Sequence, residues 1–460
     1  MAMGHDNGEQ PTLFITYDKL QGLGHPFYEA LDKLLRKHGF DRFAEKQCEH
    51  FYAEVMGRPG LAPGVYFRCL LIGYFEGIGS ERGIAWRIAD SLSLRRFLGL
   101  GLEKQPPDHS TISRTRRRLS TDMHERVFTR VLELVAEHGL LRGKTLGIDA
   151  TTLEANAALR SIVRRDNGRA YKEYLTDLAE AEGIEEPTRE DLARLDRKRP
   201  KKGSNEEWVH PSDPEAQITK MKDGSTHLAH KHEQAVDLET GAIVGVTVHG
   251  GAAGDTKTLE KTLEVADANL AEVRQEGSEK AKEQIAERVE EVVADKGYHS
   301  NDVLTNLEEV DVRSYIPEPA RGRRRWKDKQ AERDAVRRNR RRMKQSKGKE
   351  LQKKRSELVE RPFAHMLDSG EMRRVHVRGH DNILKRLVIH VAGFNLSLIM
   401  RKVHGIGKPR ALQGLRAALS ALLVAVLTLL RWLGALFGRD SPQSAPSARL
   451  SETPAHASPT

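Results

Sequence analysis

The spacing of apolar and polar residues changes along the chain, and this change separates its parts. Between residues 12 and 142, apolar side chains recur at helical spacing, which predicts a mainly helical region. Further along, two short apolar runs each end in an acid: residues 146–148 precede Asp149, and residues 292–294 precede Asp295. Such runs are typical of buried strands, so each acid is expected at the end of a strand.

The remaining patterns predict the elements around these two strands. A hairpin is expected from two segments, residues 230–237 and 241–248, because Leu238-Glu239-Thr240-Gly241 between them has the composition of a turn. Further elements are expected as helices at 255–269, 271–290 and 380–403, a strand at 313–316 and a helix carrying Glu360. Together they predict an α/β protein with a mixed sheet flanked by helices, after an all-α N-terminal region.

Shifts in composition divide the chain into three parts. Residues 1–142 are the expected helical N-terminal domain, residues 143–405 the α/β domain, and residues 406–460 an apolar helix with a disordered tail. Inside the α/β domain, residues 160–205 are densely charged at helical spacing, which predicts a helical insertion. The apolar run at 417–430 is too short for a membrane span, so a buried or partner-facing helix is expected and no membrane.

Composition narrows the class of protein. Hydrophobic residues make up 38% of the 460 residues and aromatic residues 5%, which is typical of a soluble protein of two or three domains. The two cysteines, Cys48 and Cys69, have neither metal-ligand nor disulfide spacing, which favours a reducing cytoplasm. Residues 1–11 are polar and acidic and do not resemble a secretory signal. The expected location is therefore cytoplasmic.

Positive charge is concentrated in one block. The chain has a net charge of +10 and a pI of about 9.4, and residues 321–355 alone contain 18 Lys and Arg against 4 Asp and Glu. The net charge of this block is thus +14, and the rest of the chain carries −4. The block predicts contact with a polyanion such as DNA, with a solvated charged helix as the alternative. Its candidate DNA contacts are Arg323, Arg324, Arg325, Lys353, Lys354 and Arg355.

A second basic segment lies near the end of the N-terminal region. Pro106 and Pro107 end the preceding element, and Asp108 or Ser110 is placed to cap a new helix. This helix carries four arginines close together, Arg114, Arg116, Arg117 and Arg118. A helix lying against DNA phosphates has this character, but so has a merely soluble helix.

Three histidines invite a metal interpretation. His230 and His232 would share one face of a strand, with His227 nearby. No cysteine or acid completes a zinc ligand set with them. Ordinary polar sheet positions or DNA-facing positions are therefore favoured over a metal site.

The acids Asp149, Asp295 and Glu360 stand out as the candidate catalytic residues. Three carboxylates that converge in a cleft can hold two divalent cations, which activate an attacking oxygen and stabilise a leaving oxygen in phosphoryl transfer. Carboxylates suit Mg²⁺ because they are oxygen ligands that remain ionised at neutral pH. We therefore expect two Mg²⁺ or Mn²⁺ ions as cofactors and double-stranded DNA as the partner.

The order of these motifs resembles the DDE transposases of bacterial insertion sequences. The resemblance covers roughly residues 15–405 and is most similar to the insertion-sequence-four/five superfamily, with an InsH-type N-terminal domain. It is carried by Gly147-Ile148-Asp149-Ala150-Thr151, Ala294-Asp295-Lys296-Gly297-Tyr298 and Val359-Glu360-Arg361-Pro362-Phe363-Ala364, with support from Asp213-Pro214-Glu215-Ala216, Lys222-Asp223-Gly224, Gln234-Ala235-Val236-Asp237 and Pro107-Asp108-His109-Ser110-Thr111-Ile112-Ser113.

The resemblance implies a ribonuclease-H-like fold, Asp149, Asp295 and Glu360 as the metal-binding triad, and a homodimer or higher oligomer that acts on terminal inverted repeats and target DNA. It also implies an arginine four residues before the final Glu and a lysine seven after it. These positions hold Ser356 and Leu367; Arg355 is one residue away, and Arg361 is a neighbouring cation.

Three functions remain open at this point: an active transposase, a domesticated or defective DNA-binding protein that retains the fold, and a nuclease that hydrolyses DNA without strand transfer. The three acids favour catalysis, whereas Ser356 and Leu367 favour the second of these functions.

Overall fold

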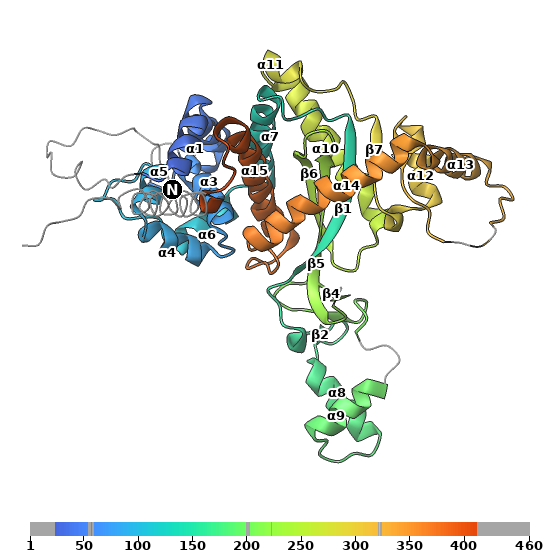
Figure 1. Ribbon diagram of the computed structural model, residues 1–460. Helices are drawn as coiled ribbons and strands as arrows, with labels where there is room; N and C mark the ends of the chain where they lie inside the picture. Colours follow the sequence, from blue (N-terminus) through green and yellow to red (C-terminus); the bar gives the residue numbers. More distant parts are fainter. Residues whose placement is uncertain are drawn as a thin grey trace, which may run out of the picture. The chain divides into compact units, whose positions relative to one another are not determined.

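A six-stranded mixed sheet organises the computed structural model (Figure 1). The structure describes residues 24–411, except 54–56, 58, 199–202, 222, 321 and 323. The strands are β1 (Thr145–Glu154), β4 (Gln217–Lys220), β5 (Thr226–Asp237), β6 (Ile243–Gly250), β7 (Glu291–Val293) and β8 (Arg313–Tyr315). Their order is β4-β5-β1-β7-β8, and β6 pairs with β5. The strands β1, β7 and β8 are parallel, whereas β5 runs antiparallel to β1, β4 and β6. The predicted mixed sheet and its hairpin are confirmed.

Helices cover both faces of this sheet. On one face, α10 (Asp255–Glu276) packs against β5 and β6, because Leu259, Thr262, Ala266 and Leu270 recur at helical spacing and are buried. On the other face, α14 (Ser346–Ala364) crosses β1 and its neighbours (Figure 1). Gly147 permits this close crossing, since a Cβ at that position would lie 2.7 Å from Val359 Cγ2.

The segment between α10 and β7 differs from its prediction. A single charged helix was expected at 271–290, but α10 continues to Glu276 and is followed by the short α11 (Glu279–Lys282). Gly277 and Ser278 cause the break, because Gly277 ends one helix and the Ser278 hydroxyl caps the next by accepting from Ala281 N. The helices α12 (Asn301–Glu309) and α13 (Gln330–Lys344) then lie beside β8.

The N-terminal region is helical, as predicted. Its helices are α1 (Pro26–Lys37), α2 (Phe40–Cys48), α3 (Pro63–Glu76), α4 (Glu81–Ala89), α5 (Leu92–Phe97), α6 (His109–Arg118) and α7 (Thr121–Glu137). The helix α15 (His380–His404) packs against α3 and α7 and also against β6, so it joins these helices to the sheet. By length and composition α15 could cross a membrane, but 89% of its apolar window is buried inside the protein, as in a soluble core helix.

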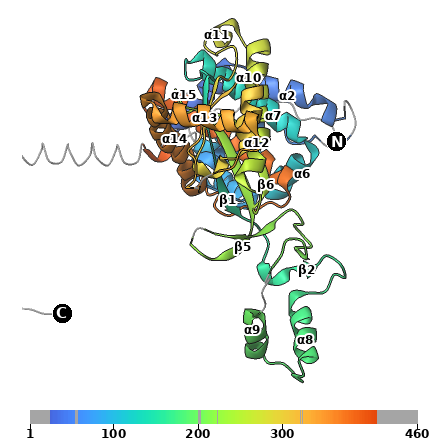
Figure 2. The same cartoon turned by 90° about the vertical axis from the view of Figure 1, so that its right-hand side faces the viewer.

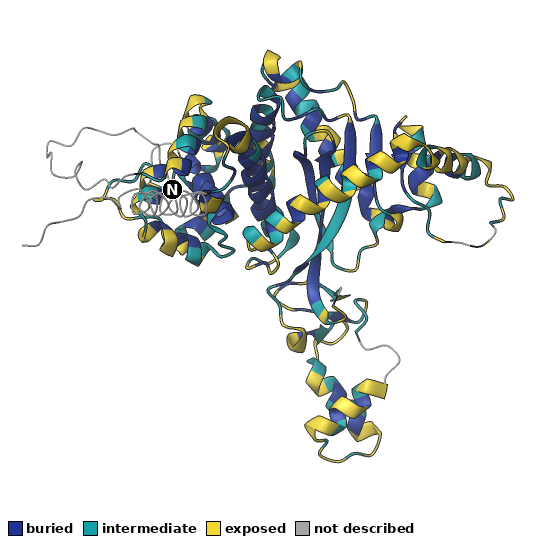
Figure 3. Cartoon of the chain, in the orientation of Figure 1, coloured by how far each residue is buried: buried dark blue, intermediate teal, exposed yellow. Residues whose placement is uncertain are grey.

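The predicted helical insertion is confirmed. It consists of β2 (Val163–Arg164), α8 (Tyr171–Ala181), α9 (Arg189–Lys198) and β3 (Trp208–Val209), and Figure 2 shows α8 and α9 as a pair beyond the small β2–β3 sheet. The two helices share a small apolar core of Leu175, Ala179, Leu192 and Leu195. Their other faces are largely exposed (Figure 3).

The chain divides into two units, residues 1–409 and residues 410–460. The predicted boundary at 142 between two domains stays a prediction. The apolar helix expected at 417–430 and the tail expected from 441 lie outside the described residues.

Candidate active site

Strand register places Asp149 and Asp295 at the same level of the sheet. In the parallel pairing of β1 with β7, Gly147 lies beside Val293, and each aspartate follows two residues later. Neighbouring strands lie about 4.8 Å apart, so the two carboxylates arrive side by side at the carboxyl edge. Asp149 belongs to β1, whereas Asp295 lies just beyond β7 and caps the short 3-10 helix η4 (Lys296–Tyr298) by accepting from Gly297 N at 2.7 Å.

The Asp149 carboxylate is crowded by charge. Its Oδ2 accepts from Arg355 Nη1 at 2.9 Å, and its Oδ1 accepts from Ala150 N at 2.8 Å. Burial raises the pKa of the Asp149 carboxyl, and the charge of Asp295 raises it further, whereas the Ala150 N–H and Arg355 act in the opposite direction. The neighbouring Asp295 therefore disfavours the ionised form of Asp149, and a cation bound beside Asp149 would relieve this cost.

The helix α14 is fixed above these strand ends by side chains along one face. Gln352 Nε2 donates to the carbonyl oxygens of Ala294 (3.1 Å) and Tyr315 (2.7 Å), at the ends of β7 and β8. Further along the helix, the Val359 carbonyl accepts from Gln234 Nε2 of β5 at 3.1 Å. Arg355 lies between these two anchors, so the fold itself delivers its guanidinium to Asp149.

Glu360 is exposed on α14. Its neighbour Leu358 lies against the hairpin turn, 3.6 Å from where a Cβ on Gly241 would be. That turn lies at the start of β1, because Leu238 N donates to Thr145 O. Positions two apart on a helix point about 200° apart, so Glu360 lies on the flank of α14 opposite Leu358.

The three acids are not assembled into a ligand set. Among the residues that the structure describes, no group of three or more His, Cys, Asp or Glu side chains is arranged to hold a metal ion. The donor chemistry of the two aspartates nevertheless fits a hard divalent cation, which prefers carboxylate oxygens. Asp295 uses Oδ1 to cap η4, and no described residue donates to its Oδ2. A third ligand from Glu360 requires its side chain to turn toward the strand ends.

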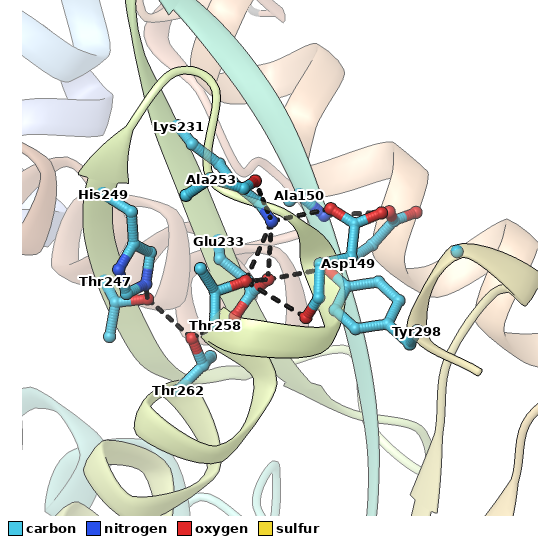
Figure 4. Close-up of polar contacts among 12 residues, drawn as sticks. Asp149, Ala150, Lys231, Glu233, Thr247, His249, Ala253, Thr258, Thr262 and Tyr298 are labelled. Carbon is cyan, nitrogen blue, oxygen red and sulfur yellow. Dashed lines mark hydrogen bonds and ion pairs between the residues drawn. The ribbon is translucent and has the colours of Figure 1, made fainter. Parts of the chain in front are cut away.

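A buried polar cluster beside this edge was missed by the sequence analysis (Figure 4). Glu233 on β5 is fully buried and accepts from the hydroxyls of Tyr298 and Thr258, each at 2.7 Å, and from the hydroxyl of Thr262. Lys231, two residues earlier, donates to Asp255 Oδ1 at 2.6 Å. The available signal was the pair of charged residues, Lys231 and Glu233, at alternate positions of one expected strand.

Comparison with known families decides what the site belongs to. The family described as "Transposase domain (DUF772)" matches residues 15–118, and the family described as "Transposase DDE domain" matches residues 187–396. The chain is a DDE transposase of an insertion sequence. A search of curated proteins gave no match. The family implies a ribonuclease-H-like core, so the predicted fold class is confirmed, and it marks the protein as a metal-dependent DNA-cleaving enzyme.

The DDE match covers the second aspartate and the glutamate of this transposase but begins after the first. Asp295 and Glu360 lie inside residues 187–396, whereas Asp149 precedes them. Asp149 is a candidate site residue because of the register of β1 and β7 and because of its contact with Arg355.

The histidines of β5 are mostly interior in the transposase. His230 and His232 are fully buried; His230 Nε2 lies 3.2 Å from Asp213 Oδ2, and the His232 ring meets Phe363 edge to face. These two therefore occupy sheet positions, and the DNA-facing alternative is wrong for them. His227 is partly exposed and lies 3.9 Å from Glu154.

The four arginines expected to face DNA are divided between surface and interior. Asp108 caps α6 as predicted, accepting from Ser110 N and Thr111 N. Arg114 and Arg117 are exposed, and Arg118 is partly buried over the Tyr52 ring. Arg116 is buried instead, because it pairs with Glu81 at 2.7 Å and with Asn382 of α15. As a surface DNA contact, Arg116 is corrected to an internal tie between α6, α4 and α15.

Part of the basic block is neutralised inside the transposase. Arg338 pairs with Glu308, and both Arg324 (2.8 Å) and Arg340 pair with Glu318. Arg325, Lys353, Lys354 and Arg361 are exposed, although Lys354 pairs with Glu350 and Arg361 with Glu357, each at 3.0 Å. Arg323 lies outside the described residues. The charge presented to DNA is therefore smaller than the net charge of the block in the sequence.

Proposed function

We propose that this transposase cleaves DNA at the ends of its insertion sequence and joins those ends to target DNA by two-metal phosphoryl transfer. The observation that carries the proposal is the register that sets Asp149 and Asp295 side by side at the carboxyl edge of parallel strands. Asp149, Asp295 and Glu360 would hold the two Mg²⁺ or Mn²⁺ ions. When bound, these cations supply activation of the attacking oxygen and stabilisation of the leaving oxygen.

The residues of α14 prepare the site for a DNA strand. Arg355 Nη1 is already at the first aspartate, so the one-residue displacement of this arginine in the sequence does not remove it from the site. A guanidinium at this position can hold phosphate oxygens in a bidentate contact and orient the strand. The exposed Lys353 and Lys354 lie two residues and one residue before it and extend positive charge along the same helix. Glu360, on the same helix, would supply the third carboxylate once its side chain turns toward the two aspartates.

DNA binding is assigned to two surfaces, each with its own role. The exposed Arg114 and Arg117 of α6 are proposed to contact the terminal inverted repeats, and the exposed part of the basic block is proposed to contact phosphates of either DNA. Because one protein must bring two ends and a target together, assembly as a homodimer or higher oligomer on DNA follows from the proposal.

A catalytically impaired DNA-binding protein is the second candidate. It is favoured by the exposed position of Glu360 away from an assembled three-acid site and by Leu367 where the resemblance implies a lysine. The two candidates share DNA binding and differ in cleavage.

The deciding experiment measures cleavage and binding on the same DNA. Matched inverted repeats flanking the coding region would identify the terminal duplex, which is labelled and incubated with the protein and Mg²⁺. We expect strand cleavage by the unaltered protein, and none by Asp295→Asn, with DNA affinity within about twofold because the backbone contacts remain. Binding without cleavage by the unaltered protein would establish the impaired candidate, and a fully active Asp295→Ala would remove the proposed site.

A further inference from the structure

Strand pairing alone does not hold the two aspartates together. The ladder between β1 and β7 ends at Gly147 and Val293, before either acid. Asp295 begins η4, so its position depends on how that short helix is anchored. The anchor is Tyr298, which is fully buried and donates its hydroxyl proton to Glu233 Oε1 at 2.7 Å.

Glu233 acts as a charged acceptor in the interior. Three hydroxyl groups donate to its two oxygens, those of Tyr298, Thr258 and Thr262, and Lys231 Nζ lies 3.5 Å from Oε1. A buried carboxylate is costly unless it is paired and hydrogen-bonded, and this one has both forms of compensation. We call these five residues the Glu233 cluster.

The Glu233 cluster reaches the candidate metal edge through Asp255. Lys231 Nζ donates to Asp255 Oδ1 at 2.6 Å and to Thr258 Oγ1 at 2.8 Å. A Cβ on Gly297 would lie 2.5 Å from Asp255 Oδ2 and 2.9 Å from Asp295 Oδ1. A side chain at position 297 would meet both carboxylates, so the positions of Asp255 and Asp295 beside η4 are linked through Gly297.

At the end of the network farthest from Asp255, the donor of each hydrogen bond can be assigned. Because Thr262 gives its proton to Glu233, it must accept from Thr247, whose oxygen lies 2.6 Å away. Thr247 in turn accepts from His249 Nε2 at 2.8 Å. Burial lowers the pKa of His249, which keeps the ring neutral with its proton on Nε2. The hydroxyl protons of Thr262 and Thr247 therefore each have one acceptor, as a rigid support requires.

We propose that the Glu233 cluster is a positioning device that sets the distance between Asp295 and Asp149 for metal binding. The inference rests on the proposed metal site and adds residues that do not touch the metal. Tyr298 and Glu233 fix η4 against β5, Lys231 and Asp255 tie β5 to the start of α10, and β5 is paired with the strand that carries Asp149. Outer residues that orient metal ligands commonly contribute 10–100-fold to affinity.

The test compares two single-hydroxyl deletions in the full-length protein. Tyr298→Phe removes the bond to Glu233. Tyr315→Phe is the matched control, because its buried hydroxyl lies 3.3 Å from Glu291 on the same sheet and outside the Glu233 cluster. Mn²⁺ binding is measured by calorimetry without DNA. We expect about tenfold weaker Mn²⁺ binding for Tyr298→Phe and unchanged binding for Tyr315→Phe, at the lower end of the range for outer ligand-orienting residues.

A second variant tests the same inference from the exposed side. Gly297→Ala leaves every residue of the Glu233 cluster in place but pushes Asp255 and Asp295 apart, so it should also weaken Mn²⁺ binding. For both variants, cleavage kcat should fall while the KM for DNA stays near its original value. Equal Mn²⁺ binding by Tyr298→Phe, Gly297→Ala and Tyr315→Phe would overturn the inference. Absence of Mn²⁺ binding by the unaltered protein would instead refute the proposed metal site, and the positioning role with it.

Discussion

The contact between Arg355 and Asp149 makes a prediction about metal affinity. The guanidinium occupies Asp149 Oδ2 at 2.9 Å, and both side chains are largely shielded, with 11% and 23% of their surfaces exposed. A divalent cation that binds Asp149 must therefore displace Arg355 or share the carboxylate with it. Arg355→Gln removes this competing cation, so Mn²⁺ should bind more tightly to the variant than to the unaltered protein.

The size of the effect follows from the hydrogen bond that the substitution removes. Hydrogen bonds to charged groups contribute about 1.5–3 kcal/mol, and the residual exposure of both groups favours the lower end of this range. About 1.4 kcal/mol corresponds to a factor of ten in an equilibrium constant. The Kd for Mn²⁺ should therefore fall about tenfold in Arg355→Gln.

The assay is calorimetric titration of Mn²⁺ into DNA-free protein at about pH 7.5, where carboxylates are ionised. Arg361→Gln is the matched control, because Arg361 lies on the same helix but pairs with the exposed Glu357 at 3.0 Å. Cleavage should fall in Arg355→Gln despite the tighter metal binding, since the proposed phosphate contact is gone. Unchanged or weaker Mn²⁺ binding in Arg355→Gln would refute the competition.

Three further predictions concern DNA binding and stability. Replacing the exposed Arg337 and Arg341 of α13 with Gln should flatten the slope of log DNA affinity against log salt concentration by about 2, because each phosphate that is no longer neutralised contributes roughly 0.9. The slope is measured by fluorescence anisotropy at several salt concentrations. An unchanged slope would show that α13 does not contact DNA. Arg117→Gln should weaken binding to the terminal repeat without lowering Tm. Arg116→Gln should instead lower the stability in thermal unfolding by about 3 kcal/mol, because it breaks the ion pair with Glu81. A loss of stability in Arg117→Gln and none in Arg116→Gln would contradict the exposed position of Arg117 and the buried position of Arg116. Burial lowers the pKa of His232 from 6.5 to about 3, so the unfolded chain takes up that proton first and stability should fall as pH drops from 6.5 towards 3. His232→Leu should make Tm less dependent on pH in this window, and an equally steep fall would assign acid sensitivity to other groups.

The sequence pattern predicted those helices and strands whose own residues show a clear apolar spacing. The apolar runs before Asp149 and Asp295 indicated that each acid lies where a buried strand gives way to polar residues, and the pairing of β1 with β7 sets the two acids side by side. The break at Gly277 and Ser278 was missed since the charged pattern continues across it, although the backbone requires a new helix start at Ser278. Arg116 was assigned to the surface because its partners Glu81 and Asn382 lie 35 and 266 residues away in sequence.

The Glu233 cluster could not be predicted from local pattern for the same reason. Its donors come from β5, α10 and η4, and Tyr298 lies 65 residues from Glu233. Lys231 and Glu233 alternate with the polar residues His230, His232 and Gln234, so the sequence does not mark their face of the strand as buried. The structure instead places α10 over that face, so both charges are interior and must find partners there. Burial on both faces depends on helix packing, which spacing within one strand does not specify.

The helix α14 carries both a proposed phosphate contact, Arg355, and a proposed metal ligand, Glu360. Gln352 fixes it to the ends of β7 and β8, Arg355 reaches Asp149, and Glu360 lies about one and a half turns further on. If a DNA phosphate takes the Arg355 guanidinium, Asp149 loses its cation just as a negatively charged strand arrives beside it. Both changes favour cation binding at the two aspartates. It follows that DNA and Mn²⁺ should bind cooperatively in the unaltered protein, and that this cooperativity should be smaller in Arg355→Gln, where Asp149 is already released. Equal cooperativity in the two proteins would show that Arg355 does not exchange between the carboxylate and the phosphate.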